Sequence, residues 1–410
     1  MPYIQRAITP ILKQRVSTSK CMLLVGARQV GKSTLIKHEF KDFNRANFDD
    51  RLTRMQAKEE PKLFFLNNPK PLFIDEVQKE SSILEDIKQI VDESDERGMF
   101  ILSGSQKLEL MKGMSESLAG RVSISELTGL SMREIYGVKF NRHFIPTDAY
   151  IKEREKEIVK YDNIWEIIHK GSYPELYDID RDWQEYYSSY VATYLERDIN
   201  ELVAADGITF TKFLTAVAAR TGELLNYSNI AGDVGVSEPT IKNWISILER
   251  TGIVYLLQPY SASELKRAIK TPKLYFRDTG LACYLTRWLT ADTLKCSAVA
   301  GNMFETFVVS EILKSYSNEG KDYRFNIFYY RGKDRNASGE NEIDLVIEED
   351  GVLYPVEIKM SGNPKASMGA TNQVLDKVSD KKRGLGVILC LIDKKTYLRE
   401  NLVALPIEFI

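Results

Sequence analysis

The chain has 410 residues, of which 43% are hydrophobic, and its formal net charge is −2. A chain of this length exceeds one ordinary hydrophobic core, so we expect two to four domains of about 100–200 residues each. The balanced charge excludes a protein that binds nucleic acid through bulk positive charge, so any such surface would be local.

Cysteine and histidine are sparse. The four cysteines lie far apart and only three histidines are present, which argues against a zinc site and a disulfide framework. The N-terminal sequence MPYIQRAITPILKQRV lacks the apolar core of a signal peptide. No stretch reaches the ~18 apolar residues that a membrane span needs. We therefore expect a cytoplasmic protein without a membrane partner.

A glycine loop follows an apolar strand near the N-terminus. Residues 26–33 match G-x-x-x-x-G-K-[ST] without a mismatch, and a helix follows them. Gly26 and Gly31 would permit the turns that aim N–H groups at phosphate oxygens, Lys32 would reach the β- and γ-phosphates, and Ser33 would bind Mg²⁺. The pattern predicts a site for ATP or ADP with Mg²⁺. Its predicted nucleotide contacts are Gly26, Ala27, Arg28, Gln29, Val30, Gly31, Lys32, Ser33, Thr34 and Asp75.

A second apolar strand, at 72–74, leads into Asp75 and Glu76. Asp75 would hold Mg²⁺, and Glu76 would orient and polarise the attacking water. An acid pair can instead simply begin a helix, but the glycine loop about 40 residues upstream weakens that alternative.

The next strand, at 99–105, ends in Ser103 and Ser105, where a polar side chain could sense the γ-phosphate or the attacking water. Arg121 then follows a helix and precedes another strand. It would either point at the nucleotide of a neighbouring subunit in a homo-oligomer, or lie on the surface where the helix dipole favours a cation.

The motifs GARQVGKST, LFIDEVQK, LSGS and LAGRVSISELTGLSMREI resemble those of a family of prokaryotic AAA+ superfamily ATPases. In that superfamily these places are Walker A, Walker B, sensor 1 and an arginine finger. The resemblance covers nearly the whole chain. It implies ATP hydrolysis, with Ser33 and Asp75 at the metal. It also implies catalytic roles for Lys32, Glu76, Ser105 and Arg121.

The middle of the chain is helical and aromatic from 141 to 211, which predicts a helical lid or linker. Residues 224–260 then resemble a winged helix, with a helix closed by Gly235 and another capped by Ser237. The second helix would enter the major groove of DNA, and the basic wing would meet phosphates. The predicted DNA contacts are Thr240, Lys242, Asn243, Lys266, Arg267, Lys270 and Lys273.

A winged helix used for protein packing or as an ATPase lid is the alternative, since Glu238 and Glu249 dilute the basic face. The stretch 270–286 looks like a hinge before the last domain. Within it, Asp278 could cap a helix.

The sequence NEIDLVIEEDGVLYPVEIKMS predicts a hairpin with strands at 343–347 and 353–358. Asp344 lies early in the first strand, while Glu357 and Lys359 are two apart and so share one face of the second. A helix and a strand precede the hairpin, and a helix and a strand follow it. This order resembles the PD-(D/E)XK nuclease-like fold.

That resemblance implies a metal-dependent phosphodiesterase site. Asp344 and Glu357 would bind Mg²⁺, and Lys359 would position and deprotonate the attacking water. Glu305, on the preceding helix, would complete the acid cluster. An exposed charged hairpin and an inert binding module of the same fold are the alternatives.

The expected fold is multidomain α/β. We expect a P-loop AAA+ domain with a parallel sheet at 1–140, a helical lid or linker at 141–211, a winged-helix domain at 212–275 and a PD-(D/E)XK nuclease-like α/β domain at 276–410. Three functions stay open. They are an ATPase acting on DNA, an ATP/ADP-controlled switch for a protein partner with an inert nuclease-like fold, and a metal-dependent DNA nuclease with a regulatory ATPase.

Overall fold

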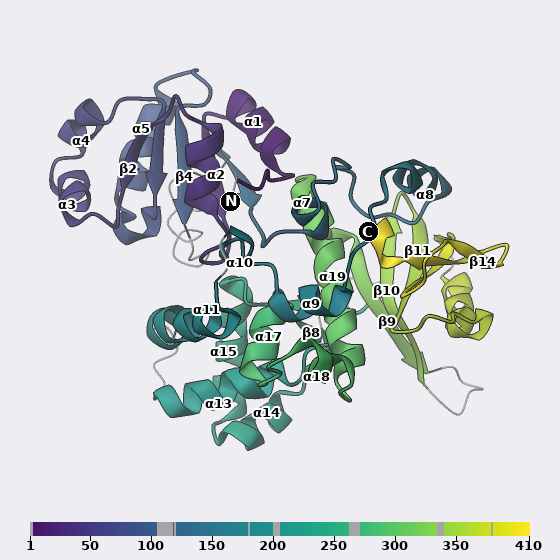
Figure 1. Cartoon of the computed structure of the whole chain (residues 1–410). Coiled ribbons are helices and arrows are strands. Elements are labelled where there is room, and N and C mark those ends of the chain that lie inside the picture. The colour runs from purple at the N-terminus through teal and green to yellow at the C-terminus, as the bar shows by residue number, and fades with distance from the viewer. Residues whose placement is uncertain are drawn as a thin grey trace.

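The computed structural model contains three sheets joined by helices (Figure 1). It describes residues 3–104, 118, 120–178, 181–199, 206–261, 271–333, 340–378 and 380–410. We divide it into an N-terminal part (3–131), a middle part (161–299) and a C-terminal part (132–160 with 300–410).

The N-terminal part is built on five parallel strands in the order β2-β3-β4-β1-β5. These are β1 (Cys21–Val25), β2 (Asn44–Asn47), β3 (Leu72–Asp75), β4 (Phe100–Gly104) and β5 (Val122–Glu126). The helices are α1 (Thr9–Thr18), α2 (Lys32–Glu39), α3 (Arg51–Glu59), α4 (Pro61–Asn67) and α5 (Ile83–Asp92). All residues of β1, β3 and β4 are buried, as expected for parallel strands with both faces covered. The predicted parallel sheet is confirmed.

The middle part is mainly helical. Its helices are α9 (Ile164–Lys170), α10 (Glu175–Asp178), α11 (Trp183–Tyr190), a π-helical turn at Val191–Ile199, α13 (Gly207–Ala218), α14 (Tyr227–Val234), α15 (Glu238–Arg250), α17 (Thr279–Leu285) and α18 (Ala291–Lys295). An antiparallel sheet in the order β6-β8-β7 joins β6 (Glu223–Leu224), β7 (Val254–Leu257) and β8 (Lys273–Phe276).

Two of the predicted helix ends in the middle part are confirmed. Gly235 closes α14 in the left-handed conformation, with φ of 82°, and the Ser237 hydroxyl caps α15. The boundary expected between 211 and 212 falls within α13.

The C-terminal part contains a seven-stranded mixed sheet in the order β14-β15-β13-β11-β10-β9, with β12 paired to β11. The strands are β9 (Ile327–Lys333), β10 (Glu340–Glu349), β11 (Val352–Lys359), β12 (Lys382–Arg383), β13 (Gly386–Cys390), β14 (Thr396–Arg399) and β15 (Leu402–Pro406). The predicted hairpin is β10–β11, and Asp350 and Gly351 turn it with φ of 50° and 76°. The long helix α19 (Ala300–Asn318) lies beside this sheet (Figure 1).

A 3₁₀ segment at Ala366–Lys377 follows the hairpin, where we expected an α-helix. The backbone of Gly369 within this segment is not helical, with φ of −103° and ψ of 17°, so a continuous helix is interrupted there.

The helices α7 (Met132–Ile135) and α8 (Asp148–Arg154) pack on the end of the chain. Arg133 donates from Nε to the carbonyl of Ile410 at 3.0 Å, and the Tyr150 hydroxyl donates to the carbonyl of Phe409 at 2.9 Å. The chain therefore leaves the N-terminal part, contacts the C-terminal part and only then enters the middle part.

Asp278 lies in a closely packed region of the middle part, between α17 and α11. As predicted, it caps α17, because its Oδ1 accepts from the backbone N–H of Leu281 at 2.8 Å. The same oxygen accepts from the Tyr187 hydroxyl at 2.7 Å. Gly280 is packed so closely that a Cβ there would lie 2.3 Å from the Tyr187 hydroxyl and 2.6 Å from the carbonyl oxygen of Lys170.

Replacing Gly280 with alanine should therefore destabilise the protein by about 1–3 kcal/mol, because a backbone atom must move to admit the methyl group. Gly301→Ala in α19 is the matched control, since a Cβ there meets nothing within 4 Å. A helical glycine replaced by alanine should gain up to about 1 kcal/mol. Denaturant unfolding of the two variants checks this, and equal stabilities would contradict the packing described.

Candidate functional site

The glycine loop lies between the end of β1 and the start of α2. Gly31, the N-cap of α2, has φ of 93°, which favours glycine. Gly26 is pressed against the chain after β5, since a Cβ on it would lie 2.2 Å from the carbonyl oxygen of Leu127. The backbone of the glycine loop is therefore in close contact with the backbone of Leu127.

Lys32 is buried at the first position of α2. Its Nζ donates to the carbonyl oxygens of Gly26 and Ala27, both at 2.9 Å. Burial lowers the pKa of Lys32 to about 8, against the opposing effect of the nearby carboxylates of Glu76 and Asp75. The ammonium therefore lies close to both acids that the sequence singled out.

Asp75 ends β3 at the carboxyl edge of the sheet and is buried. The hydroxyl of Ser103, at the corresponding end of β4, donates to its Oδ1. Glu76 follows in the left-handed conformation, with φ of 55°, and accepts a hydrogen bond from the Gln78 amide. Ser105 lies outside the described residues.

A cleft of about 560 Å³ opens beside Lys32 and Glu76, a volume typical of sites for small ligands. We call it the nucleotide cleft. It is lined by Arg28, Gln29, Gly31, Lys32, Ser33, Thr34 and Glu76 of the predicted site, and by Tyr3, Ile4, Arg6, Leu130, Pro174, Glu175 and Asp178. The second group comes from the N-terminus, the chain after β5 and α10, and no sequence pattern indicated it. The oxygens of Ser33 and Asp75 are the hard ligands that Mg²⁺ prefers.

Arg121 is half-buried and forms an ion pair with Asp92 at the end of α5 in the same chain. The predicted DNA contacts on α15 face outward in part. Lys242 and Asn243 are exposed, while Thr240 is half-buried and hydrogen-bonded to the Ser237 hydroxyl. Lys242 also pairs with Glu238 at 2.8 Å.

Of the four basic wing residues, Lys266, Arg267 and Lys270 lie outside the described residues. Lys273, expected at the surface, is buried on β8 and pairs with Glu305 at 3.2 Å and Glu342 at 2.6 Å. It is therefore unavailable as a free phosphate contact.

The hairpin residues form a second candidate site, which we call the acid–lysine cluster: Asp344, Glu357 and Lys359. The Lys359 ammonium bonds Asp344 Oδ2 and Glu357 Oε2, each at 2.8 Å. Asp344 lies at an irregularity in the pairing of β10 with β9, and its Oδ2 also accepts from the backbone N–H of Ile358 at 2.8 Å. The predicted sharing of one face by Glu357 and Lys359 is confirmed.

Glu357 carries the unusual chemistry of the acid–lysine cluster. Burial, followed by the charge of Asp344, raises the pKa of Glu357 to about 7. Its Oε1 is buried without a hydrogen-bond partner in the structure. A buried carboxylate oxygen that lacks a partner costs free energy unless a proton, a water molecule or a cation satisfies it.

Glu305, on α19, lies near enough to feel the charge of Asp344 but is hydrogen-bonded to residues of β8. Its Oε1 accepts from the Tyr275 hydroxyl at 2.6 Å and from Lys273 at 3.2 Å. Burial and the charge of Asp344 raise the pKa of Glu305. Within the described ranges, no group of three or more His, Cys, Asp or Glu side chains is arranged to hold a metal ion. The oxygens of Asp344 and Glu357 nevertheless fit one hard cation, with the unpartnered Oε1 as a free ligand.

Three family models match separate parts of the chain. Residues 18–136 match the family model described as an AAA domain. The N-terminal part therefore resembles an AAA domain, and we call it the AAA domain below. Its match spans the glycine loop, Asp75, Glu76 and the strand after Arg121. Residues 161–292 match a domain of unknown function (DUF8612), and residues 300–410 match another (DUF4143).

Similar proteins add little about function. The uncharacterized protein Rv2008c of Mycobacterium tuberculosis is 27% identical over 375 residues, which span 89% of this chain and 76% of that protein. DnaA from Aquifex aeolicus, bound to AMPPCP, aligns with a TM-score of 0.27 and 14% identity over 70% of this chain and 92% of that chain. The STAND protein PH0952 from Pyrococcus horikoshii aligns with a TM-score of 0.27 and 10% identity, covering 77% of this chain and 47% of that chain. Scores this low carry no argument about activity.

A search of the described segments for membrane-spanning helices found none with the length and apolar character required.

The affinity of the AAA domain for ADP should fall as the pH rises through the pKa of Lys32, about 8. The lysine binds phosphate as an ammonium, which predominates below its pKa and is lost above it, whereas phosphate groups are already ionised above about pH 7. We expect the Kd to rise about fivefold between pH 8 and pH 9. Titration of a fluorescent ADP analogue at each pH measures this.

Lys32→Arg is the control for that titration, because a guanidinium stays charged over the whole range. If this variant binds, its affinity should stay constant from pH 7 to 9. A wild-type affinity that is equally constant would show that the charge of Lys32 does not titrate there.

Proposed function

We propose that the AAA domain hydrolyses ATP bound in the nucleotide cleft. The observation that supports this most strongly is the convergence of Lys32, Asp75 and Glu76 at the carboxyl edge of the parallel sheet, beside a cleft of suitable size. In α/β sheets, ligands bind at this edge. The neighbouring domains match only models of unknown function, so the proposal rests on the AAA domain itself.

The roles of the residues follow from their chemistry. Lys32 would exchange its two backbone carbonyl partners for phosphate oxygens, and the N–H groups of residues 26–33 would surround the phosphates. Ser33 and Asp75 would hold Mg²⁺, which when bound neutralises charge on the phosphates. Glu76 would orient and polarise the attacking water. Ser103 would fix the Asp75 carboxylate, and Arg121 would have to leave Asp92 before it could reach a nucleotide.

Glu76→Gln should abolish ATP hydrolysis while leaving ADP affinity within about twofold, because the amide cannot accept a proton yet keeps the shape of the side chain. Glu80→Gln is a matched control at the end of the short 3₁₀ helix Val77–Glu80, which Glu76 directly precedes, and should hydrolyse ATP normally. Phosphate release and ADP titration check both variants. Full hydrolysis by Glu76→Gln would sink the assigned role.

As a second function, we propose that the acid–lysine cluster cleaves phosphodiester bonds in DNA with a bound divalent cation. The specific support is the buried, unpartnered Oε1 of Glu357 beside Asp344, with an ammonium on the same pair of carboxylates. Asp344 and Glu357 would hold the cation, and Lys359 would hold the attacking water or stabilise charge on the phosphate.

The middle part supports DNA as the partner. Its element order of helix, strand, two helices and two strands matches a winged helix, and α15 presents exposed Lys242 and Asn243. To bind a DNA phosphate, Lys242 would have to break its ion pair with Glu238. If the acid–lysine cluster binds a cation but does not cleave DNA, the alternative function is an ATP/ADP-controlled switch that binds a protein partner.

Supercoiled plasmid incubated with the full chain and Mn²⁺ or Mg²⁺ should be nicked, and Asp344→Ala or Lys359→Ala should remove at least about 99% of that activity. Lys365→Ala, an exposed lysine just beyond the hairpin, should nick like the wild type. Nicking that survives Asp344→Ala would place the activity elsewhere. If the wild-type protein does not nick at all, the inert module is favoured.

A further inference from the structure

The segment from Leu127 to Met132, which we call the wall segment, forms the back of the nucleotide site. The N–H of Leu127 donates to the carbonyl of Val25 at 2.8 Å, and its own carbonyl oxygen leaves no room for a Cβ on Gly26. Leu130 lines the nucleotide cleft. The position of the glycine loop therefore depends on where the wall segment is held.

Arg6 fastens the wall segment to the glycine loop. Its guanidinium donates to the carbonyl of Val30 at 2.8 Å and to the carbonyl of Thr128 at 2.7 Å. The same side chain forms a buried ion pair with Glu134 at 2.9 Å. The loop and the wall segment thus form one hydrogen-bonded unit.

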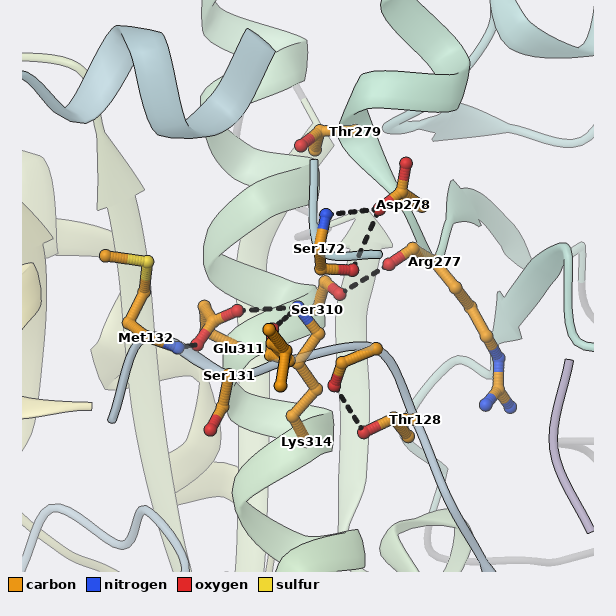
Figure 2. A network of polar contacts seen from close by, with 12 residues as sticks. Thr128, Ser131, Met132, Ser172, Arg277, Asp278, Thr279, Ser310, Glu311 and Lys314 are labelled. Atoms are coloured by element: carbon orange, nitrogen blue, oxygen red, sulfur yellow. Dashed lines mark hydrogen bonds and ion pairs between the residues drawn. The ribbon is translucent and has the colours of Figure 1, made fainter. Parts of the chain in front are cut away.

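The middle part holds the wall segment from one side. The N–H of Leu130 donates to the carbonyl of Ser172 at 2.7 Å, and a Cβ on Gly129 would lie 2.2 Å from the Ser172 hydroxyl oxygen. Ser172 is fixed in turn, because its N–H and hydroxyl both donate to Asp278 Oδ2, at 2.7 and 2.8 Å (Figure 2).

The C-terminal part holds the wall segment from the other side, through α19. Lys314 donates from Nζ to the carbonyl of Leu130 at 3.0 Å and pairs with Glu311 Oε1 at 2.7 Å. Glu311 Oε2 accepts from the N–H of Met132 at 2.8 Å, an N–H at the start of α7 that has no helical acceptor. Both side chains are 6% exposed, so each needs the other and its backbone partner (Figure 2).

We propose that Glu311 and Lys314 are positioning residues of the nucleotide site, supplied by the C-terminal part. They act through the backbone of Leu130 and Met132, to which they are hydrogen-bonded. Affinity for ATP and ADP then depends on α19 as well as on the AAA domain. The inference rests on the proposed function, since it takes ATP and ADP as the ligands of the nucleotide cleft.

Lys314→Met in the full chain tests it, because methionine keeps an unbranched side chain that ends one atom shorter, at Cε, and loses the donor. We expect the Kd for a fluorescent ADP analogue to rise about tenfold or more, the size of losing one hydrogen bond from a charged donor. Lys314→Arg can still reach both partners and should recover much of that affinity. Lys381→Met is the matched control, since it breaks a 2.7 Å ion pair with Glu348 within the C-terminal part.

A second measurement on the wild-type protein covers the case in which Lys314→Met does not fold. ADP should slow amide hydrogen exchange in peptides covering the wall segment and residues 311–315 of α19, besides the glycine loop. Protection confined to the glycine loop, or an unchanged Kd in Lys314→Met, would overturn the proposal. A wild-type protein that binds no ADP would instead overturn the proposed function, so the two failures are distinguishable.

Discussion

The backbone of residues 127–132 is the point on which the arrangement of the three parts depends. Its N–H and C=O groups are bonded by Ser172 from the middle part and by Lys314 and Glu311 from the C-terminal part. Each of these contacts is buried, so breaking one leaves a polar group without water to replace its partner. The glycine loop, the cover that α10 gives to the nucleotide cleft and the position of α19 all follow from this junction.

The helix α19 packs against β11, the strand that carries Glu357 and Lys359, and is also hydrogen-bonded to the wall segment. Glu311 and Lys314 face the wall segment, while Glu305 lies near the other end of the helix and is bonded to Lys273 and Tyr275 of β8. Nine residues separate Glu305 from Lys314, which is about 14 Å along an α-helix. A rigid element of this length gives the nucleotide site and the acid–lysine cluster a shared structural support.

Sequence patterns predicted the parts of these sites that are local in the chain. The glycine loop, Asp75 and Glu76 follow buried strands whose apolar runs are continuous, and Glu357 and Lys359 share a face because side chains alternate along a strand. The cap at Asp278 could also be predicted from the sequence, because Asp, Thr and Gly are preferred at the N-cap of a helix.

The remaining parts depend on contacts between distant segments, which spacing cannot reveal. Tyr3, Arg6 and Leu130 reach the nucleotide cleft only after the chain has folded. Lysine is a residue type typical of an exposed wing, yet Lys273 is buried. Two carboxylates from other elements, those of Glu305 and Glu342, offset the cost of burying its charge. Glu311 and Lys314 sit on a helix that is buried nearly all round, so its pattern gave no indication of which partners they meet.

A crystal structure of the full chain with Mg²⁺ and a non-hydrolysable ATP analogue tests the central claim most directly. The account predicts the triphosphate surrounded by the N–H groups of residues 26–33, with Lys32 on its phosphates and Mg²⁺ beside Ser33 and Asp75. A nucleotide bound elsewhere, with Lys32 still bonded to the carbonyls of Gly26 and Ala27, would contradict it.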